Sequence, residues 1–320
     1  MSHIGFVVSL FLFLSVGDGF CSDVLSENVE KTGGDKMGSV RESVIAGSWY
    51  PGDSEELSKV IDGYLNDVQV GATGDIYALI SPHAGYRYSG RAAAYAYKTL
   101  QNQTITTVII LAPGHHTAFR GASILDVEYY ETPLGKVKLD SDICAKLLKS
   151  DLFSTNRSAH RNEHSIEIQL PFLQSVLGEF SIVPILIGHL EESDYTGIAE
   201  SIKNCIDAET VVVVSSDFTH YGLNFGYLPF RSDIKSNIAK LDGGAIDKII
   251  NKDKIGFSDY LSKTGATICG REPIKILLEI LPQNVSGREL IYYTSGDLTG
   301  DYSSCVSYAS IIFKLDGASK

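Results

Sequence analysis

The sequence predicts an α/β protein, in which one large domain has a central mixed sheet flanked by helices. Short apolar runs rich in β-branched residues alternate with helical stretches, which is typical of this class. The run Val-Val-Val-Val at 211–214 has no polar residue, so its strand is expected to be buried on both faces of the sheet. Neither an internal repeat nor a low-complexity tract follows residue 40, which favours one domain over two.

Each element is assigned from the spacing of its apolar residues. Strands are expected in short runs of apolar and β-branched residues, and helices where apolar residues recur every three or four positions. The predicted strands are 76–81, 107–111, 182–187, 211–215, 290–294 and 305–314. The predicted helices are 54–66, 90–100, 141–149, 165–177, 193–206, 233–250 and 273–281.

The first 40 residues differ from the rest. Residues 6–16 are almost entirely apolar, but as a helix they would span about 16 Å, too short for a bilayer core of about 30 Å. Their length and the small residues that follow are those of a secretory signal, although no Lys or Arg precedes them. We therefore expect a signal peptide at 1–22, a linker at 23–40 and the folded domain at 41–320. A mis-assigned start codon and a buried N-terminal helix are the alternatives.

This N-terminal prediction also sets the expected location. With a true signal the protein is secreted or periplasmic, and no membrane span is left once the signal is removed. Without one, it is cytoplasmic.

The net charge of the chain indicates whether nucleic acid is an expected partner. There are 27 Lys and Arg against 39 Asp and Glu, which gives a net charge of −12. Phosphate backbones repel a chain this acidic, and no basic stripe offsets the repulsion. Nucleic acid is therefore not an expected partner.

The cysteines give no zinc-knuckle pattern, because no pair has CxxC spacing. Spacing alone leaves open which of Cys144, Cys205, Cys269 and Cys305 would pair in an oxidising compartment. Cys305, at the start of the last predicted strand, is most simply a small core residue.

Histidines follow three of the predicted strands. His83 comes after the first strand, His115 after the second, and Asp217 and His220 after the fourth. In open α/β sheets, ligand-binding groups gather at the carboxyl ends of the strands. A solvated surface position explains any one loop histidine, but packing does not explain three on one edge. We therefore expect these side chains to form a site.

Two further segments carry reactive groups. Glu163 and His164 are adjacent, and a carboxylate beside an imidazole orients a proton-transfer group or a ligand. Ser165 is expected to be the N-cap of the helix that follows. Cys269 precedes another predicted helix, where backbone N–H groups make a thiol more acidic, and a buried inert thiol is the alternative. Imidazoles together with a thiolate suit iron, copper or zinc.

Other catalytic patterns are absent. The sequence has no GxxxxGK[ST], no strand-borne GxGxxG and no GxSxG. Ser215, Asp217 and His220 are too close in sequence to converge as a Ser–His–Asp triad.

Seven segments, in order along the chain, resemble the motifs of one family. They are Ala-Gly-Ser-Trp-Tyr-Pro at 46–51, Ser-Pro-His-Ala-Gly-Tyr at 81–86, Pro-Gly-His-His at 113–116, Glu-His-Ser-Ile-Glu at 163–167, Val-Ser-Ser-Asp-Phe-Thr-His at 214–220, Thr-Ile-Cys-Gly-Arg at 267–271 and Ser-Ser-Cys-Val-Ser-Tyr-Ala at 303–309. Together they resemble the Memo family, called AmmeMemoRadiSam system protein B in prokaryotes. The resemblance runs from about residue 41 to residue 313.

The resemblance implies a fold similar to the class III extradiol dioxygenases and a mononuclear metal site. The implied metal ligands are His83, His115 and Cys269. The implied metal is iron or copper. Zinc is a further choice, because a soft thiolate favours Cu(I) or zinc. By analogy with the dioxygenases, the residues that act in proton transfer and orientation are His220, His164, Asp217 and Glu163.

The function implied by the resemblance is redox or oxygenase-like chemistry on a small-molecule substrate. The alternative is a non-catalytic metal-handling or peptide-binding protein, in which Trp49, Tyr86 and Tyr88 form an aromatic rim for the ligand. Packing in the core or at the domain edge is the other explanation for these aromatics. The prokaryotic family name also implies a functional partnership with AMMECR1-like and radical SAM proteins.

Overall fold

Four parallel strands form the middle of the sheet. In spatial order they are β8 (Ser181–Ile187), β3 (Thr107–Pro113), β9 (Thr210–Ser215) and β2 (Ile76–Ser81). All six residues of β9 are buried, which confirms the expectation of a strand buried on both faces. Because the four strands are parallel, their carboxyl ends meet at one edge of the sheet.

The sheet is mixed at both edges, as predicted. Beyond β2 lie the antiparallel strand β12 (Ser304–Leu315) and its neighbours β11 (Val285–Thr294) and β10 (His220–Gly222). Beyond β8 lie β6 (Gly135–Leu139), β5 (Tyr129–Thr132) and β1 (Val40–Arg41). β4 (Ala122–Ile124) also pairs with β8, and β7 (Phe153–Ser154) pairs with β4.

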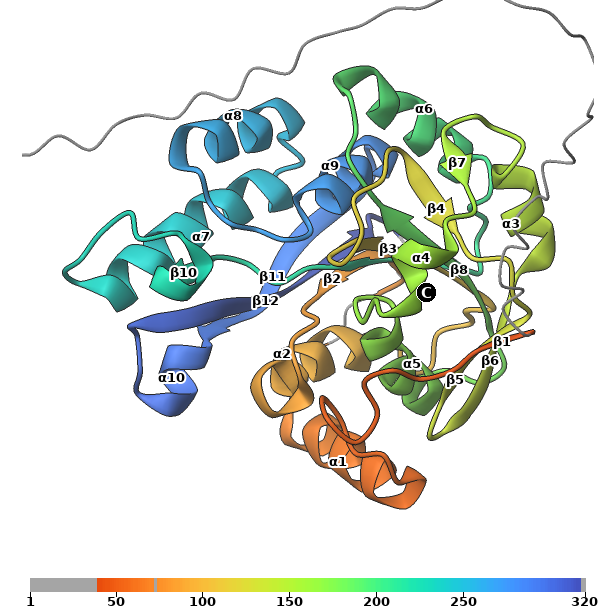
Figure 1. Ribbon diagram of the computed structural model, residues 1–320, viewed down its shortest axis with the longest axis horizontal. Helices are drawn as coiled ribbons and strands as arrows, with labels where there is room; N and C mark the ends of the chain where they lie inside the picture. Colours follow the sequence, from red (N-terminus) through yellow and green to blue (C-terminus); the bar gives the residue numbers. More distant parts are fainter. Residues whose placement is uncertain (1–38, 72–73, 318–320) are drawn as a thin grey trace, which may run out of the picture. The chain divides into compact units, whose positions relative to one another are not determined.

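Helices cover both faces of the sheet (Figure 1). One layer consists of α1 (Ser54–Asp67), α2 (Tyr86–Lys98) and α5 (Leu170–Val176), which pack on one another. The other layer consists of α6 (Glu192–Lys203), α9 (Arg271–Ile280), α8 (Lys254–Thr264) and α7 (Ile234–Ile250). The shorter helices are α3 (Ser141–Leu147), α4 (Arg157–Arg161) and α10 (Ser295–Thr299), with 3₁₀ turns η1 (Glu167–Gln169) and η2 (Leu223–Phe225). The predicted single α/β domain is confirmed.

The computed structural model describes residues 39–71 and 74–317. The expected signal peptide at 1–22 and most of the expected linker at 23–40 lie outside these residues. Within the described ranges, no helix is both long and apolar enough to cross a membrane. In the same ranges all four cysteines are free thiols.

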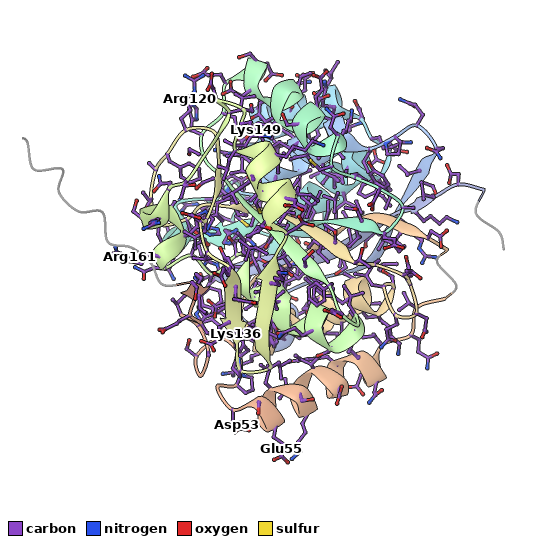
Figure 2. All side chains as sticks on the ribbon, turned by 90° about the vertical axis from the view of Figure 1, so that its right-hand side faces the viewer. Asp53, Glu55, Arg120, Lys136, Lys149 and Arg161 are labelled. Carbon is purple, nitrogen blue, oxygen red and sulfur yellow. The ribbon has the colours of Figure 1, made fainter. Side chains whose placement is uncertain are left out.

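The start of α1 illustrates how local sequence sets an element boundary. Asp53 Oδ1 accepts hydrogen bonds from the backbone N–H groups of Glu55 and Glu56, at 3.0 and 2.9 Å. Figure 2 shows Asp53 and Glu55 together at one end of this helix. The cap satisfies N–H groups that have no partner inside the helix, so the helix begins at residue 54 as predicted.

The helix expected at 165–177 is shorter and is divided into η1 and α5. Ser165 is not its N-cap. The Ser165 hydroxyl is buried and donates to the carbonyl of Pro113, at 2.8 Å, and so it ties this segment to the end of β3. The N-cap prediction is therefore wrong, because a distant backbone acceptor takes the hydroxyl.

Some elements lack a strong apolar pattern and were not predicted. α8 has Phe257 as its one buried residue, so its sequence shows little of a helical stripe. The β5–β6 hairpin alternates buried with exposed or partly exposed positions at the margin of the sheet, where the apolar signal is weak.

A glycine lets α9 approach the end of β9. A Cβ added to Gly270 would lie 2.3 Å from Ser216 Cβ and 2.8 Å from the carbonyl oxygen of Ser215. We expect Gly270→Ala to lower the free energy of unfolding by about 1–3 kcal/mol, because the backbone must shift to admit the methyl group. The measurement is urea unfolding.

The matched control is Gly243→Ala, inside α7, where a Cβ would meet nothing within 4 Å. That change should be neutral or stabilising, since Ala is the better helix former. Equal effects of the two substitutions would contradict the packing argument.

Candidate metal centre

Loops at one end of the sheet bring three imidazoles together. His83 follows β2, His115 follows β3, and His164 precedes η1. One ring nitrogen from each of them lies within 4.8 Å of the others. The rings of His115 and His164 are stacked with centroids 4.7 Å apart, and His83 meets both rings edge-on. The structure therefore groups His164, expected to act in proton transfer, with the two expected histidine ligands.

A chain of hydrogen bonds fixes the tautomer of His83. Gln169 Nε2 donates to Ser215 Oγ at 2.8 Å, and the Ser215 hydroxyl donates to the Ser165 carbonyl at 2.7 Å. The Ser215 oxygen is then left as an acceptor for His83 Nδ1, 2.9 Å away. His83 consequently carries its proton on Nδ1, and its Nε2 lone pair faces the site, 3.1 Å from Cys269 Sγ.

One buried carboxylate holds the other two imidazoles. Glu163 Oε1 lies 2.9 Å from Nδ1 of His115 and 3.3 Å from Nδ1 of His164, and Oε2 accepts the backbone N–H of His115 at 2.6 Å. A carboxylate at Nδ1 favours a proton there and leaves the Nε2 lone pair for a ligand. Glu163, expected as a partner of His164, therefore orients both rings.

The pKa values of His83 and His164 favour neutral imidazoles, and that of Glu163 favours an ionised carboxylate. Burial, followed by the charge of His115, lowers the pKa of His83 well below its usual value. Burial, followed by the charge of His83, lowers the pKa of His164 to about 3. Burial acts to raise the pKa of Glu163, but hydrogen bonds and charge from His115 and the charge of His164 outweigh it, so that pKa is lowered. Neutral imidazole is the form that binds metal ions.

Cys269 lies beside His83, but its sulfur is not one of the three grouped donors. The Sγ accepts the backbone N–H of Asp217 at 3.2 Å. Burial, followed by the Asp217 carboxylate, raises the pKa of the Cys269 thiol well above its usual value. The expectation of a more acidic thiol is therefore wrong, because these two effects outweigh the start of α9.

Asp217 and His220 lie at the same edge of the sheet but make different hydrogen bonds. Asp217 Oδ1 accepts the backbone N–H groups of His83 and Ala84, at 2.8 and 3.3 Å, and so shapes the loop that carries His83. Burial raises the pKa of Asp217. His220 Nδ1 lies 3.0 Å from the carbonyls of both Phe218 and Thr267, which places the proton on Nδ1 and leaves Nε2 as an acceptor.

The site opens into a cavity of about 770 Å³. His83, His115, His164, Asp217 and His220 all line it. So do several residues that the sequence did not single out, among them Arg87, Phe225, Asp301 and Tyr308. A cavity of this size accommodates a small organic molecule.

Two of the three aromatics expected at a rim are found there. Trp49 and Tyr88 line the cavity and are each 37% exposed, and the Trp49 ring lies 4.3 Å from that of His164. Tyr86 is instead buried, and its hydroxyl donates to the carbonyl of Ile168. Its place in the rim was wrong, because its ring packs against Phe172 in the core.

A buried ion pair anchors the segment that carries Trp49. Arg41 and Glu167 are paired, with side chains 2% and 0% exposed. The Glu167 carboxylate also accepts the Tyr50 hydroxyl at 2.7 Å and backbone N–H groups of Val44 and Ile45. This anchor was not predicted. The one sequence signal was the Glu at the end of the Glu-His-Ser-Ile-Glu segment.

The buried side chain of His160 is expected to make the free energy of unfolding depend on pH. It is 1% exposed, with Tyr130 Oη and Ser123 Oγ each 3.1 Å from a ring nitrogen. Burial, followed by the charge of Arg41, lowers its pKa to about 3. The unfolded chain binds this proton below about pH 6.5, and the folded chain only near the lowered pKa, so this residue destabilises the fold as the pH falls from 6.5.

Between pH 7 and pH 5 the free energy of unfolding should fall in both proteins, and we expect the fall to be about 2 kcal/mol smaller in His160→Gln than in the parent. This difference follows from about 1.4 kcal/mol per pH unit below pH 6.5. Urea unfolding at the two pH values measures this difference. Parallel losses in both proteins would show that His160 does not carry the effect.

Comparisons with known proteins agree with the motifs. The family model for Memo-like proteins matches residues 41–312. Protein MEMO1 of Homo sapiens is 35% identical over 285 residues, which are 84% of this chain and 96% of that protein. A MEMO1 family protein of Methanopyrus kandleri is 34% identical over 290 residues, 86% of this chain and 99% of that protein.

Among solved structures, an uncharacterized protein of Escherichia coli K12 aligns with a TM-score of 0.47 and 13% identity, over 74% of this chain and 99% of that one. That likeness is too slight to carry an argument. The family match and the sequence relatives both cover more than four fifths of the chain, and on these grounds the protein belongs to the Memo family.

Proposed function

We propose that the protein binds one transition-metal ion at His83 and His115 and uses it in redox or oxygenase-like chemistry on a small molecule. The observation that carries this proposal is the group of three imidazole nitrogens within 4.8 Å, at the edge of a cavity of about 770 Å³. Nothing in ordinary core packing requires three imidazoles there, each with its Nδ1 against an oxygen acceptor.

The donor set fits a first-row metal ion. His164 is the third donor by position, and Cys269 Sγ is close enough to His83 Nε2 to serve as a third or fourth. Imidazoles with or without a thiolate suit iron, copper and zinc, and a thiolate shifts the preference toward Cu(I) or zinc. When bound, such an ion supplies Lewis acidity or a redox couple.

The chain's own residues would do the remaining work. Glu163 and Ser215 hold Nδ1 of His115 and His83, which would leave Nε2 of each ring free to bind an ion. His220 lines the same cavity, its Nδ1 lies against two backbone carbonyls, and histidine is a common proton carrier in catalysis, so we assign it proton transfer. Asp217 keeps the His83 loop in place.

Metal content is the direct test. The full chain is purified with and without air, and bound iron, copper and zinc are measured by mass spectrometry for the parent and for Cys269→Ser. We expect about one ion per chain in the parent. Absence of all three metals from both preparations would overturn the proposal. Loss of metal from Cys269→Ser would show that the sulfur is a ligand. Full retention would indicate His164 as the third ligand instead.

Turnover is tested separately. We expect oxygen uptake by the loaded protein with members of a catechol panel, and His220→Ala should reduce it while the metal content stays unchanged. If metal and activity are lost together, His220 is a ligand rather than a proton carrier.

The second candidate is a metal-handling or peptide-binding protein without turnover. The exposed rings of Trp49 and Tyr88 at the cavity mouth favour it, because such aromatics bind side chains of a peptide. Bound metal without oxygen uptake across the panel would support this candidate over the first. Partnership with AMMECR1-like and radical SAM proteins and export by residues 1–22 are further proposals, which rest on the family name and on the N-terminal sequence.

A further inference from the structure

A second cavity reaches the same centre. Its volume is about 440 Å³, and its walls come from the segments at 113–119, 187–189 and 267–273. Within residues 39–71 and 74–317, His115 is the one residue that lines both cavities. Cys269 lines the second cavity and not the first, whereas His83 and His164 line the first and not the second. His115 is therefore a shared wall, and the thiol is approached from the second cavity.

The second cavity has a cationic side and an apolar side. Among the described residues, the Arg271 side chain makes one hydrogen bond, from Nε to Glu272 at 3.1 Å, and it is 59% exposed. The Glu272 carboxylate also accepts the Tyr195 hydroxyl and lies 3.5 Å from Lys275 Nζ, so Lys275 offsets its charge. The terminal guanidinium nitrogens of Arg271 are left to bind a ligand.

The apolar side is formed by side chains from the same three segments. These are Phe119, Ile187, Ile268 and Pro273. A guanidinium fork above an apolar wall matches a small molecule with a carboxylate at one end and a short hydrocarbon at the other.

We propose that the second cavity is a binding site for a small organic carboxylate, with the carboxylate on Arg271 and the hydrocarbon end against Cys269 and His115. The ligand reaches the sulfur without passing through the first cavity. The site needs no metal, so it stands or falls independently of the proposed function. An occupied site covers the thiol and one face of His115.

Alkylation of Cys269 tests both the route and the charge preference. The full chain is treated with a chelator and then with iodoacetate or iodoacetamide, which are similar in size and differ in charge. In either reaction a sulfur–carbon bond forms, iodide leaves and the thiol proton passes to the buffer. Peptide mass spectrometry gives the rate at each cysteine. Cys205 is the internal reference, because it is partly exposed and lines neither cavity.

We expect the ratio of the iodoacetate rate to the iodoacetamide rate to be higher at Cys269 than at Cys205. Arg271→Gln should lower the ratio at Cys269 by about fivefold, the size expected for one solvent-exposed charge pair, and leave Cys205 unchanged. Propionate should protect Cys269 in the parent and not in Arg271→Gln. An unchanged ratio in Arg271→Gln would overturn the carboxylate assignment.

Two exposed positions test the route. Ala118→Trp, at the second cavity, should slow both reagents at Cys269, and Thr299→Trp, at the first cavity, should slow neither. The reverse result would show that the thiol is reached through the first cavity, and the proposal would fail.

Discussion

His83→Ala is expected to abolish tight metal binding, with a loss of affinity of at least about a hundredfold. His83 is buried, its Nε2 lone pair is directed into the site, and its Nδ1 is held by Ser215 at 2.9 Å. Changes to residues that merely support a ligand cost about 10- to 100-fold in affinity, so removal of His83, a proposed ligand, should cost more.

The single tryptophan gives a direct measurement of this loss. Trp49 is the one Trp in the sequence, and its ring lies 4.3 Å from that of His164. Titration with Cu²⁺ should quench its fluorescence in the parent and not in His83→Ala, and the metal retained after gel filtration should fall in parallel.

His116→Ala is the matched control. His116 is adjacent to His115 in sequence and its ring lies 6.1 Å from that of His164, yet it is not one of the grouped donors. The His116→Ala variant should still bind metal, and Cu²⁺ should still quench its Trp49 fluorescence. Equal affinities for His83→Ala and the parent would refute the site.

Arg41→Met is expected to lower the free energy of unfolding by about 3–5 kcal/mol, because it leaves the Glu167 carboxylate buried without its cation. The methionine keeps much of the apolar stem, so the loss reports the ion pair together with the hydrogen bonds that the guanidinium donates to the carbonyls of Glu42 and Glu163. Urea unfolding measures the loss. A red shift of Trp49 emission should accompany it in the folded protein, since Glu167 accepts the backbone N–H groups of Val44 and Ile45 and the Tyr50 hydroxyl, on either side of Trp49 in sequence.

Two further variants make this result specific. The double variant Arg41→Met with Glu167→Gln should recover part of the loss, because no unpaired buried charge remains. Lys59→Met removes the exposed pair with Glu55, whose side chains are 72% and 78% exposed, and should change stability little. Similar losses from Arg41→Met and Lys59→Met would contradict the role of burial.

Local patterns in the sequence were sufficient to predict the central strands of the sheet and the edge at which the candidate histidines lie, but not edge strands such as β5 and β6. A continuous apolar run marks a buried strand, and a histidine after such a strand lies at the edge where parallel strands end. The residues that orient the imidazoles depend on long-range contacts. Glu163 was paired with its neighbour His164, but its shorter contact is with His115, 48 residues away.

The remaining misses have the same cause. Ser215 and Gln169 read as ordinary strand and helix residues, and their role appears once the fold places them 2.8 Å apart. The acidity of Cys269 was predicted from one nearby element, the start of a helix. The pKa of this thiol is raised instead by burial and by the charge of the Asp217 carboxylate, 52 residues away in sequence.

The hydrogen-bond chain behind His83 also blocks proton transfer from its Nδ1 into the protein. Tyr97 donates to Gln169 Oε1, Gln169 donates to Ser215, and the Ser215 hydroxyl ends on the Ser165 carbonyl. Each donor hydrogen is already directed at an acceptor, and a carbonyl oxygen does not pass a proton onward. A proton on His83 Nδ1 therefore has no exit into the protein interior. All proton exchange of this ring must take place at Nε2, on the side that faces Cys269.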